Sequence, residues 1–178
     1  MSKDTALLIV DVQAFMIEHP PYQGNAIVER IEKLINRSRD LDIPVIYIQH
    51  CGKEGSPFEI GAPTWHIHPA ITPRENDPVI QKFASDSFLD TQLQNELESR
   101  EINHLVIVGL QTEYCIDTTS RRAISLGYDV TLINDCHSTF DGSVLKAEQI
   151  IAHHNSVLNG FGTAKNRITV KSSDEIFI

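Results

Sequence analysis

Short, continuous apolar runs recur along the chain and predict buried strands. The first run is Ala6–Val10, and later ones follow at Pro44–Gln49, His104–Gly109 and Val130–Ile133. Runs of this length without polar alternation are typical of strands that are covered on both faces. Residues Arg167–Val170 are a candidate for a last strand.

Helical periodicity separates these runs. From Asn25 to Leu41 the apolar positions 27, 31, 34 and 35 fall on one face of a helix. Similar patterns predict helices at about 88–100, 115–126 and 143–158. Strands that alternate with helices indicate an α/β fold, a three-layer αβα sandwich with a mostly parallel central sheet. The length of 178 residues suits a single domain over residues 1–178.

One segment breaks this alternation. Residues 51–81 are rich in Gly and Pro and show little periodicity. An irregular segment of this length inside a compact domain usually serves a function, such as a lid or a pocket wall.

Three chemically interesting residues are predicted at the carboxyl ends of strands, where ligands bind in such folds. Asp11 directly follows the first run, Lys82 follows the apolar stretch Pro78–Gln81, and Cys115 follows the strand ending at Gly109. Taken singly, each has a plain interpretation: a turn-capping acid, a solvated surface charge and a buried structural thiol. Together, an acid, a base and a thiol facing one crevice are what an activated cysteine needs.

The predicted position of Cys115 favours its reactivity. If a helix begins there, its free N–H groups and its dipole stabilise the thiolate, which is the nucleophilic form.

Composition narrows the function classes. The chain carries 15 basic and 24 acidic residues, a formal net charge of −9, which argues against nucleic acids and anionic membranes as partners. The amino terminus has no signal-peptide apolar region, and no apolar run is long enough to span a membrane. The three cysteines, 51, 115 and 136, cannot all pair with one another. We expect a cytoplasmic protein with reduced thiols.

Four motifs in order resemble the isochorismatase-like cysteine hydrolases, a family that includes nicotinamidases, N-carbamoylsarcosine amidases and the streptothricin hydrolase type. The resemblance covers essentially the whole chain. The motifs are Leu-Ile-Val-Asp11-Val-Gln13 followed by Phe15, Gln-Lys82-Phe-Ala-Ser-Asp-Ser-Phe88, Gly109-Leu-Gln-Thr-Glu-Tyr-Cys115-Ile-Asp-Thr-Thr, and Arg121-Arg-Ala-Ile-Ser-Leu-Gly127.

The resemblance implies a role for each catalytic residue. Cys115 would be the nucleophile, Asp11 would carry the thiol proton to the leaving group, and Lys82 would stabilise the thiolate and orient the carboxylate. It also implies a cis peptide between Leu110 and Gln111, which would direct the backbone N–H of Gln111 at the oxyanion beside that of Cys115.

No cofactor and no metal are expected. Nicotinamidases carry an Asp and a His, two positions apart, after the second strand, but this chain reads Gln49-His50-Cys51-Gly52 there. His66 and His68 lack an evident acidic partner other than Glu59. The residues expected to bind a small-molecule substrate are Gln13, Phe15, Trp65, Phe88 and Tyr114.

Three functions stay open. The leading one is hydrolysis of a C–N bond in a small amide, lactam or carbamoyl compound through Cys115, possibly in the manner of streptothricin hydrolase. The second is cleavage of a vinyl ether, as in isochorismatase proper, and the third is ligand binding without catalysis. The family resemblance also implies a homodimer or homotetramer.

Overall fold

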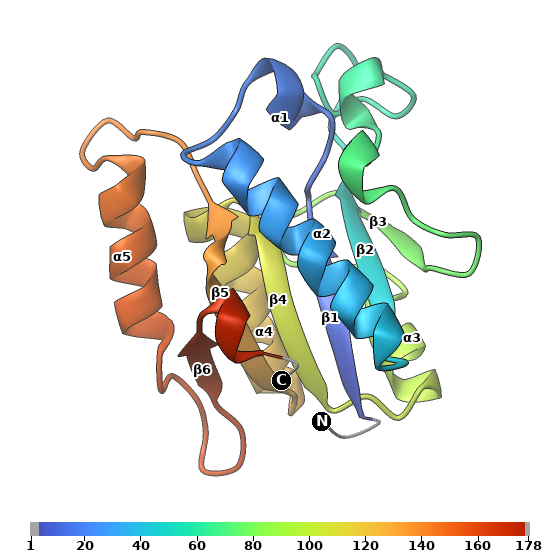
Figure 1. The fold of residues 1–178 in the computed structure, drawn as a ribbon, viewed down its shortest axis with the longest axis vertical. Helices are drawn as coiled ribbons and strands as arrows, with labels where there is room; N and C mark the ends of the chain where they lie inside the picture. The colour runs from blue at the N-terminus through green and yellow to red at the C-terminus, as the bar shows by residue number, and fades with distance from the viewer. Residues whose placement is uncertain (1–3, 177–178) are drawn as a thin grey trace.

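The computed structural model describes residues 4–176 as a twisted parallel sheet covered by helices on both faces (Figure 1). All neighbouring strands pair in parallel, in the order β3-β2-β1-β4-β5-β6. The strands are β1 (Thr5–Val10), β2 (Val45–His50), β3 (Val79–Lys82), β4 (His104–Leu110), β5 (Asp129–Ser138) and β6 (Ile168–Lys171). The predicted α/β sandwich is confirmed.

The central strands are buried because helices cover both of their faces. Every residue of β1 is buried, and alternate side chains enter two separate apolar clusters: Leu8 lies in one and Leu7 in the other. A continuous apolar run with no polar face is what such a strand requires.

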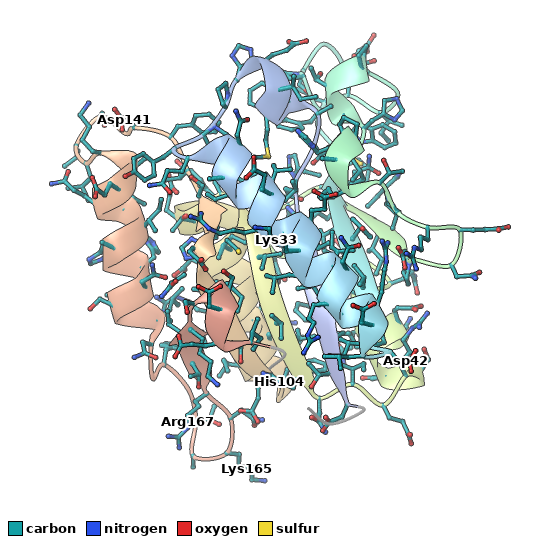
Figure 2. The ribbon with its side chains drawn as sticks, in the orientation of Figure 1. Lys33, Asp42, His104, Asp141, Lys165 and Arg167 are labelled. Carbon is teal, nitrogen blue, oxygen red and sulfur yellow. The ribbon has the colours of Figure 1, made fainter. Side chains whose placement is uncertain are left out.

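The helices divide between the two faces of the sheet. The long helix α2 (Gly24–Asp40) packs its buried stripe on the Leu7 face, whereas its Lys33 lies exposed on the opposite side (Figure 2). The other face is covered by α3 (Leu93–Ser99), α4 (Asp117–Leu126) and Leu158 of α5 (Ala147–Leu158). The short α1 (Phe15–Glu18) follows β1. Among the described residues, no helix has the length and apolar character that a membrane crossing requires.

Several predicted elements differ from the structure in extent. The helices predicted at about 88–100 and 143–158 begin later, at Leu93 and Ala147. Strand β5 runs to Ser138, beyond the predicted Ile133, because the pairing with β4 shifts between Ile107 and Gly109 and then resumes. The helix predicted from position 115 is preceded by a π-helical turn, η3 (Thr112–Ile116), and α4 begins only at Asp117. The predicted irregular segment 51–81 is irregular up to residue 78, with two short 3-10 turns at Pro63–Trp65 and Pro69–Ile71, but its last residues belong to β3.

Candidate active site

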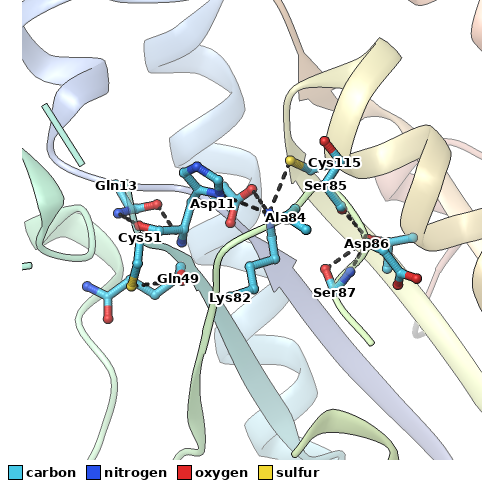
Figure 3. Close-up of polar contacts among 12 residues, drawn as sticks. Asp11, Gln13, Gln49, Cys51, Lys82, Ala84, Ser85, Asp86, Ser87 and Cys115 are labelled. Atoms are coloured by element: carbon cyan, nitrogen blue, oxygen red, sulfur yellow. Dashed lines mark hydrogen bonds and ion pairs between the residues drawn. The ribbon is translucent and has the colours of Figure 1, made fainter. Parts of the chain in front are cut away.

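Four neighbouring strands deliver polar side chains to one edge of the sheet. Asp11 follows β1, His50 ends β2, Lys82 ends β3, and the turn after β4 carries Cys115. Because the strands are parallel, their carboxyl ends lie together, and the three predicted catalytic residues meet there (Figure 3).

A glycine allows the strands beside Asp11 to approach closely. Gly109 has a φ of +120°, and a Cβ atom added there would lie 2.0 Å from the carbonyl oxygen of Val10. Any larger residue would therefore push β4 away from β1. The same close approach sets the turn that carries Cys115 beside Asp11.

Lys82 is the centre of the polar cluster. Its Nζ lies 2.7 Å from Oδ2 of Asp11 and donates hydrogen bonds to Sγ of Cys115 (3.1 Å) and to the carbonyl oxygen of Ala84 (2.9 Å). The side chain is fully buried. Burial by itself would lower its pKa, but the charges and hydrogen bonds of Asp11 and Cys115 outweigh this effect and raise the pKa above its usual value. Lys82 therefore stays an ammonium ion.

The thiol of Cys115 does not have the lowered pKa that the sequence suggested. Burial, followed by the negative charge of Asp11, raises the pKa to about 11, although Lys82 opposes the shift. The group is therefore a thiol near pH 7 that needs a base, and Asp11 lies beside it.

Asp11 has a carboxylate oxygen that is free to accept the thiol proton. Its Oδ2 is held by Lys82, whereas Oδ1 is buried and has no hydrogen-bond partner among residues 4–176. A buried carboxylate oxygen without a partner is costly, and a proton donor placed there would satisfy it. The backbone at Asp11 is left-handed, with a φ of 54°, a conformation that Asp adopts more readily than most residues.

The turn before Cys115 has the predicted backbone. The peptide bond between Leu110 and Gln111 is cis. The carbonyl oxygen of Gln111 accepts hydrogen bonds from the N–H groups of Tyr114 and Ile116, which closes the wide turn η3. The backbone of Gln111 and that of Cys115 thus belong to one compact turn at the cavity wall.

A cavity of about 230 Å³ opens above the polar cluster. Its walls are mostly apolar and aromatic, as in most small-molecule sites. Of the predicted substrate-binding residues, Gln13, Phe15 and Tyr114 lie in this lining. The complete lining is Asp11, Gln13, Phe15, Met16, His50, Phe58, Ser85, Leu110, Gln111, Tyr114, Cys115 and Phe140.

Trp65 and Phe88 lie outside the cavity, and their prediction as pocket walls is corrected. The carbonyl oxygen of Trp65 accepts hydrogen bonds from Gln13 and Gln49, and its indole N–H donates to Sγ of Cys51. Phe88 is buried in the core and stacks on Tyr128 with 5.8 Å between ring centroids. Both aromatic residues stabilise the fold around the site.

Gln13 has a structural task as well. Its side-chain amide donates to the carbonyl oxygens of His50 (3.1 Å) and Trp65 (2.6 Å), and its Oε1 accepts from the N–H of His50. These contacts fasten the irregular segment to the end of β2. They also occupy the polar atoms that the sequence suggested for substrate.

Several lining residues were not predicted, and their sequence signals were weak. In the sequence, His50 stands out only because it lies in the stretch where nicotinamidases carry their metal ligands, and Ser85 lies in the motif around Lys82. Phe58 comes from the irregular segment and packs against the rings of Phe15 and His50. The sequence predicted that this segment forms a lid or a pocket wall, but it did not indicate that the side chain of Phe58 faces the cavity.

The histidines considered as metal ligands have other contacts. Nδ1 of His50 lies 3.4 Å from the Nζ of Lys82, and Nδ1 of His68 accepts a hydrogen bond from the N–H of Ala70. Within residues 4–176, His, Cys, Asp and Glu side chains form no group of three that could hold a metal ion.

Comparison with known proteins gives a consistent result. A family model for the isochorismatase domain matches residues 5–153. Streptothricin hydrolase from Streptomyces noursei is 31% identical over 138 residues, which cover 76% of this chain but 50% of that protein. The chain thus spans about half the length of this curated relative. A more distant relative, ureidoacrylate amidohydrolase RutB from Variovorax paradoxus, is 22% identical over 188 residues, covering 84% of this chain and 74% of that protein.

Solved structures agree with the sequence matches. The crystal structure of a candidate isochorismatase hydrolase from Oleispira antarctica superposes with a TM-score of 0.90 at 30% identity, covering 99% of this chain and 97% of that one. The fold, the order of its elements and the family model all point to one family.

Proposed function

The chain belongs to the isochorismatase family of cysteine hydrolases, and from this premise we propose that it cleaves a C–N bond of a small, uncharged amide, lactam or carbamoyl compound. One observation carries the proposal: Nζ of Lys82 lies 3.1 Å from Sγ of Cys115 and 2.7 Å from Oδ2 of Asp11 at the floor of the cavity. An acid–base group, a cation and a thiol in mutual contact are the parts of an activated nucleophile.

The first half of the reaction forms an acyl-enzyme. Asp11 accepts the thiol proton while Sγ of Cys115 attacks the carbonyl carbon, and Lys82 balances the negative charge. The oxyanion is stabilised by the backbone N–H groups of Gln111 and Cys115. Asp11 then returns the proton to the leaving nitrogen, the C–N bond breaks, and a thioester remains on Cys115.

The second half repeats the proton transfers with water. Asp11 takes a proton from a water molecule that attacks the thioester carbon, and the C–S bond breaks. The thiolate regains a proton from Asp11. The sum is amide plus water giving acid plus amine, with the protein unchanged.

The cavity favours this reaction over cleavage of isochorismate. Isochorismate carries two carboxylates, but among residues 4–176 the side chains that line the cavity include no arginine and no lysine. The nearest cation, Lys82, is fully buried and already paired with Asp11. A dicarboxylate would thus enter an apolar cavity whose lining carries only the negative charge of Asp11, which is unfavourable. The names of the two relatives, a streptothricin hydrolase and an amidohydrolase, support the same reading.

A screen of neutral primary amides, lactams and carbamoyl compounds, read by release of ammonia or amine, tests the proposal. We expect turnover that disappears in Cys115→Ser and persists in Cys51→Ser, since Cys51 is buried outside the cavity lining. Release of pyruvate from isochorismate would instead establish the vinyl-ether reaction. Binding of amides without any turnover would indicate a protein that only binds its ligand.

A further inference from the structure

His50 is the one imidazole in the cavity lining, and the mechanism above does not use it. Its backbone N–H and carbonyl oxygen are both held by the side chain of Gln13. Its ring meets Phe58 edge-on, with 5.5 Å between centroids, and its Nδ1 faces Nζ of Lys82 at 3.4 Å. The backbone is therefore fixed by Gln13, and the ring contacts Phe58 and Lys82.

The contact with Lys82 decides which ring nitrogen carries the proton. An ammonium group can only donate hydrogen bonds, so Nδ1 of His50 faces it with a lone pair. Burial and the positive charge of Lys82 lower the pKa of His50, and the negative charge of Asp11 only partly opposes them. The ring is thus neutral near pH 7, and its single proton lies on Nε2.

The described residues leave that N–H group free to face the cavity. Across the described part of the chain, no hydrogen-bond partner is found for Nε2 of His50, although the ring lines the cavity. Because the N–H group is accessible from the cavity, a ligand with a matching acceptor can pair with it, whereas a ligand without one would leave it desolvated, which costs binding free energy.

We propose that His50 is a specificity-determining residue, whose Nε2–H donates a hydrogen bond to a second acceptor atom of an uncharged amide substrate. The proposal rests on the proposed function. Strands β2 and β4 flank β1 in the sheet, so His50 and Gln111 stand on opposite sides of Asp11. The reacting carbonyl at Gln111 is therefore distinct from the acceptor at His50.

The cavity limits what else the substrate carries. At about 30 Å³ for each water molecule of the liquid, a volume of about 230 Å³ suits a substrate portion of on the order of ten non-hydrogen atoms inside the open cavity. The lining offers no cation to a carboxylate. The substrate class is thus a compact neutral amide, with an apolar ring or branch between its reacting carbonyl and its second acceptor.

Isosteric probes test the hydrogen bond without relying on turnover. Benzamide and the three pyridinecarboxamide isomers have the same shape, but each isomer places one ring-nitrogen acceptor at a different position. Dissociation constants would be measured by NMR titration of Cys115→Ser protein. We expect at least one isomer to bind roughly 2–12-fold tighter than benzamide, the range of one well-placed hydrogen bond.

Three further substitutions, each made in the Cys115→Ser protein, test whether His50 causes the tighter binding of an isomer relative to benzamide. His50→Phe removes the donor and keeps an aromatic ring, so the preference should vanish. His50→Gln can both accept from Lys82 and donate to the ligand, so the preference should return. Phe58→Leu changes the wall beside His50 but leaves the donor, and the preference should persist. Failure of every isomer to exceed benzamide, or an unchanged preference in His50→Phe, would overturn the proposal.

Two further measurements separate the possible failures. Nitrogen-15 chemical shifts of the ring report the tautomer directly, and a proton on Nδ1 of His50 would refute the argument whatever the ligands do. Turnover of the same amides by the wild-type protein tests the proposed function alone. Amides that bind with the expected preference but are never hydrolysed would refute the hydrolase while leaving the role of His50 intact.

Discussion

The Nζ of Lys82 lies 2.7 Å from Oδ2 of Asp11, and the two side chains are only 0% and 9% exposed. A pair so poorly hydrated forms because each charge removes the cost of burying the other. Lys82 has three N–H donors, and besides Asp11 they face Sγ of Cys115, the carbonyl of Ala84 and, at the longest distance, His50. The cluster therefore has a structural role as well as the proposed catalytic one.

Removing one member of this pair should destabilise the fold. Lys82→Met leaves the carboxylate of Asp11 buried and unpaired, and we expect a loss of roughly 3–5 kcal/mol in the free energy of unfolding, measured by urea denaturation at pH 7. The double variant Lys82→Met/Asp11→Asn removes both charges and should regain much of that loss while staying inactive. Strictly additive destabilisation in the double variant would contradict an ion pair.

Much of this arrangement could be predicted from the sequence. The runs at Ala6–Val10 and Pro44–Gln49 are apolar throughout, so neither could be mistaken for a half-exposed strand. Once those strands are parallel, the carboxyl-end rule brings Asp11, Lys82 and Cys115 to one edge. That rule does not predict how deeply the side chains are buried. The predicted position at a helix start indicated a lowered pKa for Cys115, but burial is the main reason that this pKa is raised.

The missed pocket residues have a related cause. Strands and helices have a period that reveals which side chain faces the core, whereas the irregular segment has none. Trp65 and Phe58 are both aromatic residues of that segment, but only Phe58 lines the cavity. The difference lies in hydrogen bonds to Gln13, Gln49 and Cys51, which hold Trp65 elsewhere, and no spacing in the sequence encodes them.

The rate at which each thiol is alkylated should depend on its access to the cavity and, for Cys115, on the negative charge of Asp11. Cys51 and Cys136 are buried, whereas Cys115 reaches the cavity, so iodoacetamide should label Cys115 first and faster as the pH rises toward its pKa of about 11. Asp11→Asn should accelerate labelling several-fold, because it removes a charge that raises this pKa, and Lys82→Met should slow it. A short time course read by mass spectrometry decides, and earlier modification of Cys51 would refute the assignment of the nucleophile.

Hydrolysis should not depend on a divalent metal ion. The ring of His50 faces the ammonium group of Lys82 at 3.4 Å, which is where a second cation would be repelled. Dialysis against EDTA should leave kcat/KM unchanged, and added zinc should not increase it. Loss of activity with EDTA and recovery with zinc would show that histidines 50, 66 and 68 bind a metal in solution.

The outer surface near α5 suggests that copies of the chain associate. Val144 is 89% exposed, and Leu145, Val157 and Phe161 are also exposed apolar residues. Exposed apolar side chains are costly to leave in water, and together with the family resemblance they lead us to expect a dimer or tetramer in sedimentation at micromolar concentration. Val157→Glu should weaken the assembly, whereas Lys33→Glu on the outer face of α2 should not. A wild-type protein that sediments as a 20.0 kDa monomer would refute this expectation.

Stability should fall in mild acid because of His137. The ring is buried between Oγ1 of Thr112 (2.8 Å from Nδ1) and Oδ1 of Asn155 (2.9 Å from Nε2). Burial is the main reason that its pKa falls to about 4; His154 lowers it further, and Asn155 and Asp135 oppose the shift. Because the unfolded chain binds this proton near pH 6.5 and the folded chain only near pH 4, unfolding takes up a proton between these values.

The sign of the effect follows from that uptake. The free energy of unfolding should be independent of this group above pH 6.5 and should fall by up to ~3 kcal/mol as the pH drops to about 4. His137→Gln keeps a donor and an acceptor but cannot be protonated in this range, so its stability should change less between pH 7 and pH 4.5 than that of the wild type. Urea denaturation of both proteins at the two pH values measures the difference. An equal change in the free energy of unfolding for both proteins would show that His137 is protonated in the folded protein in this pH range. The contact with Thr112, the first residue of the turn that carries Cys115, would then be made by the protonated ring.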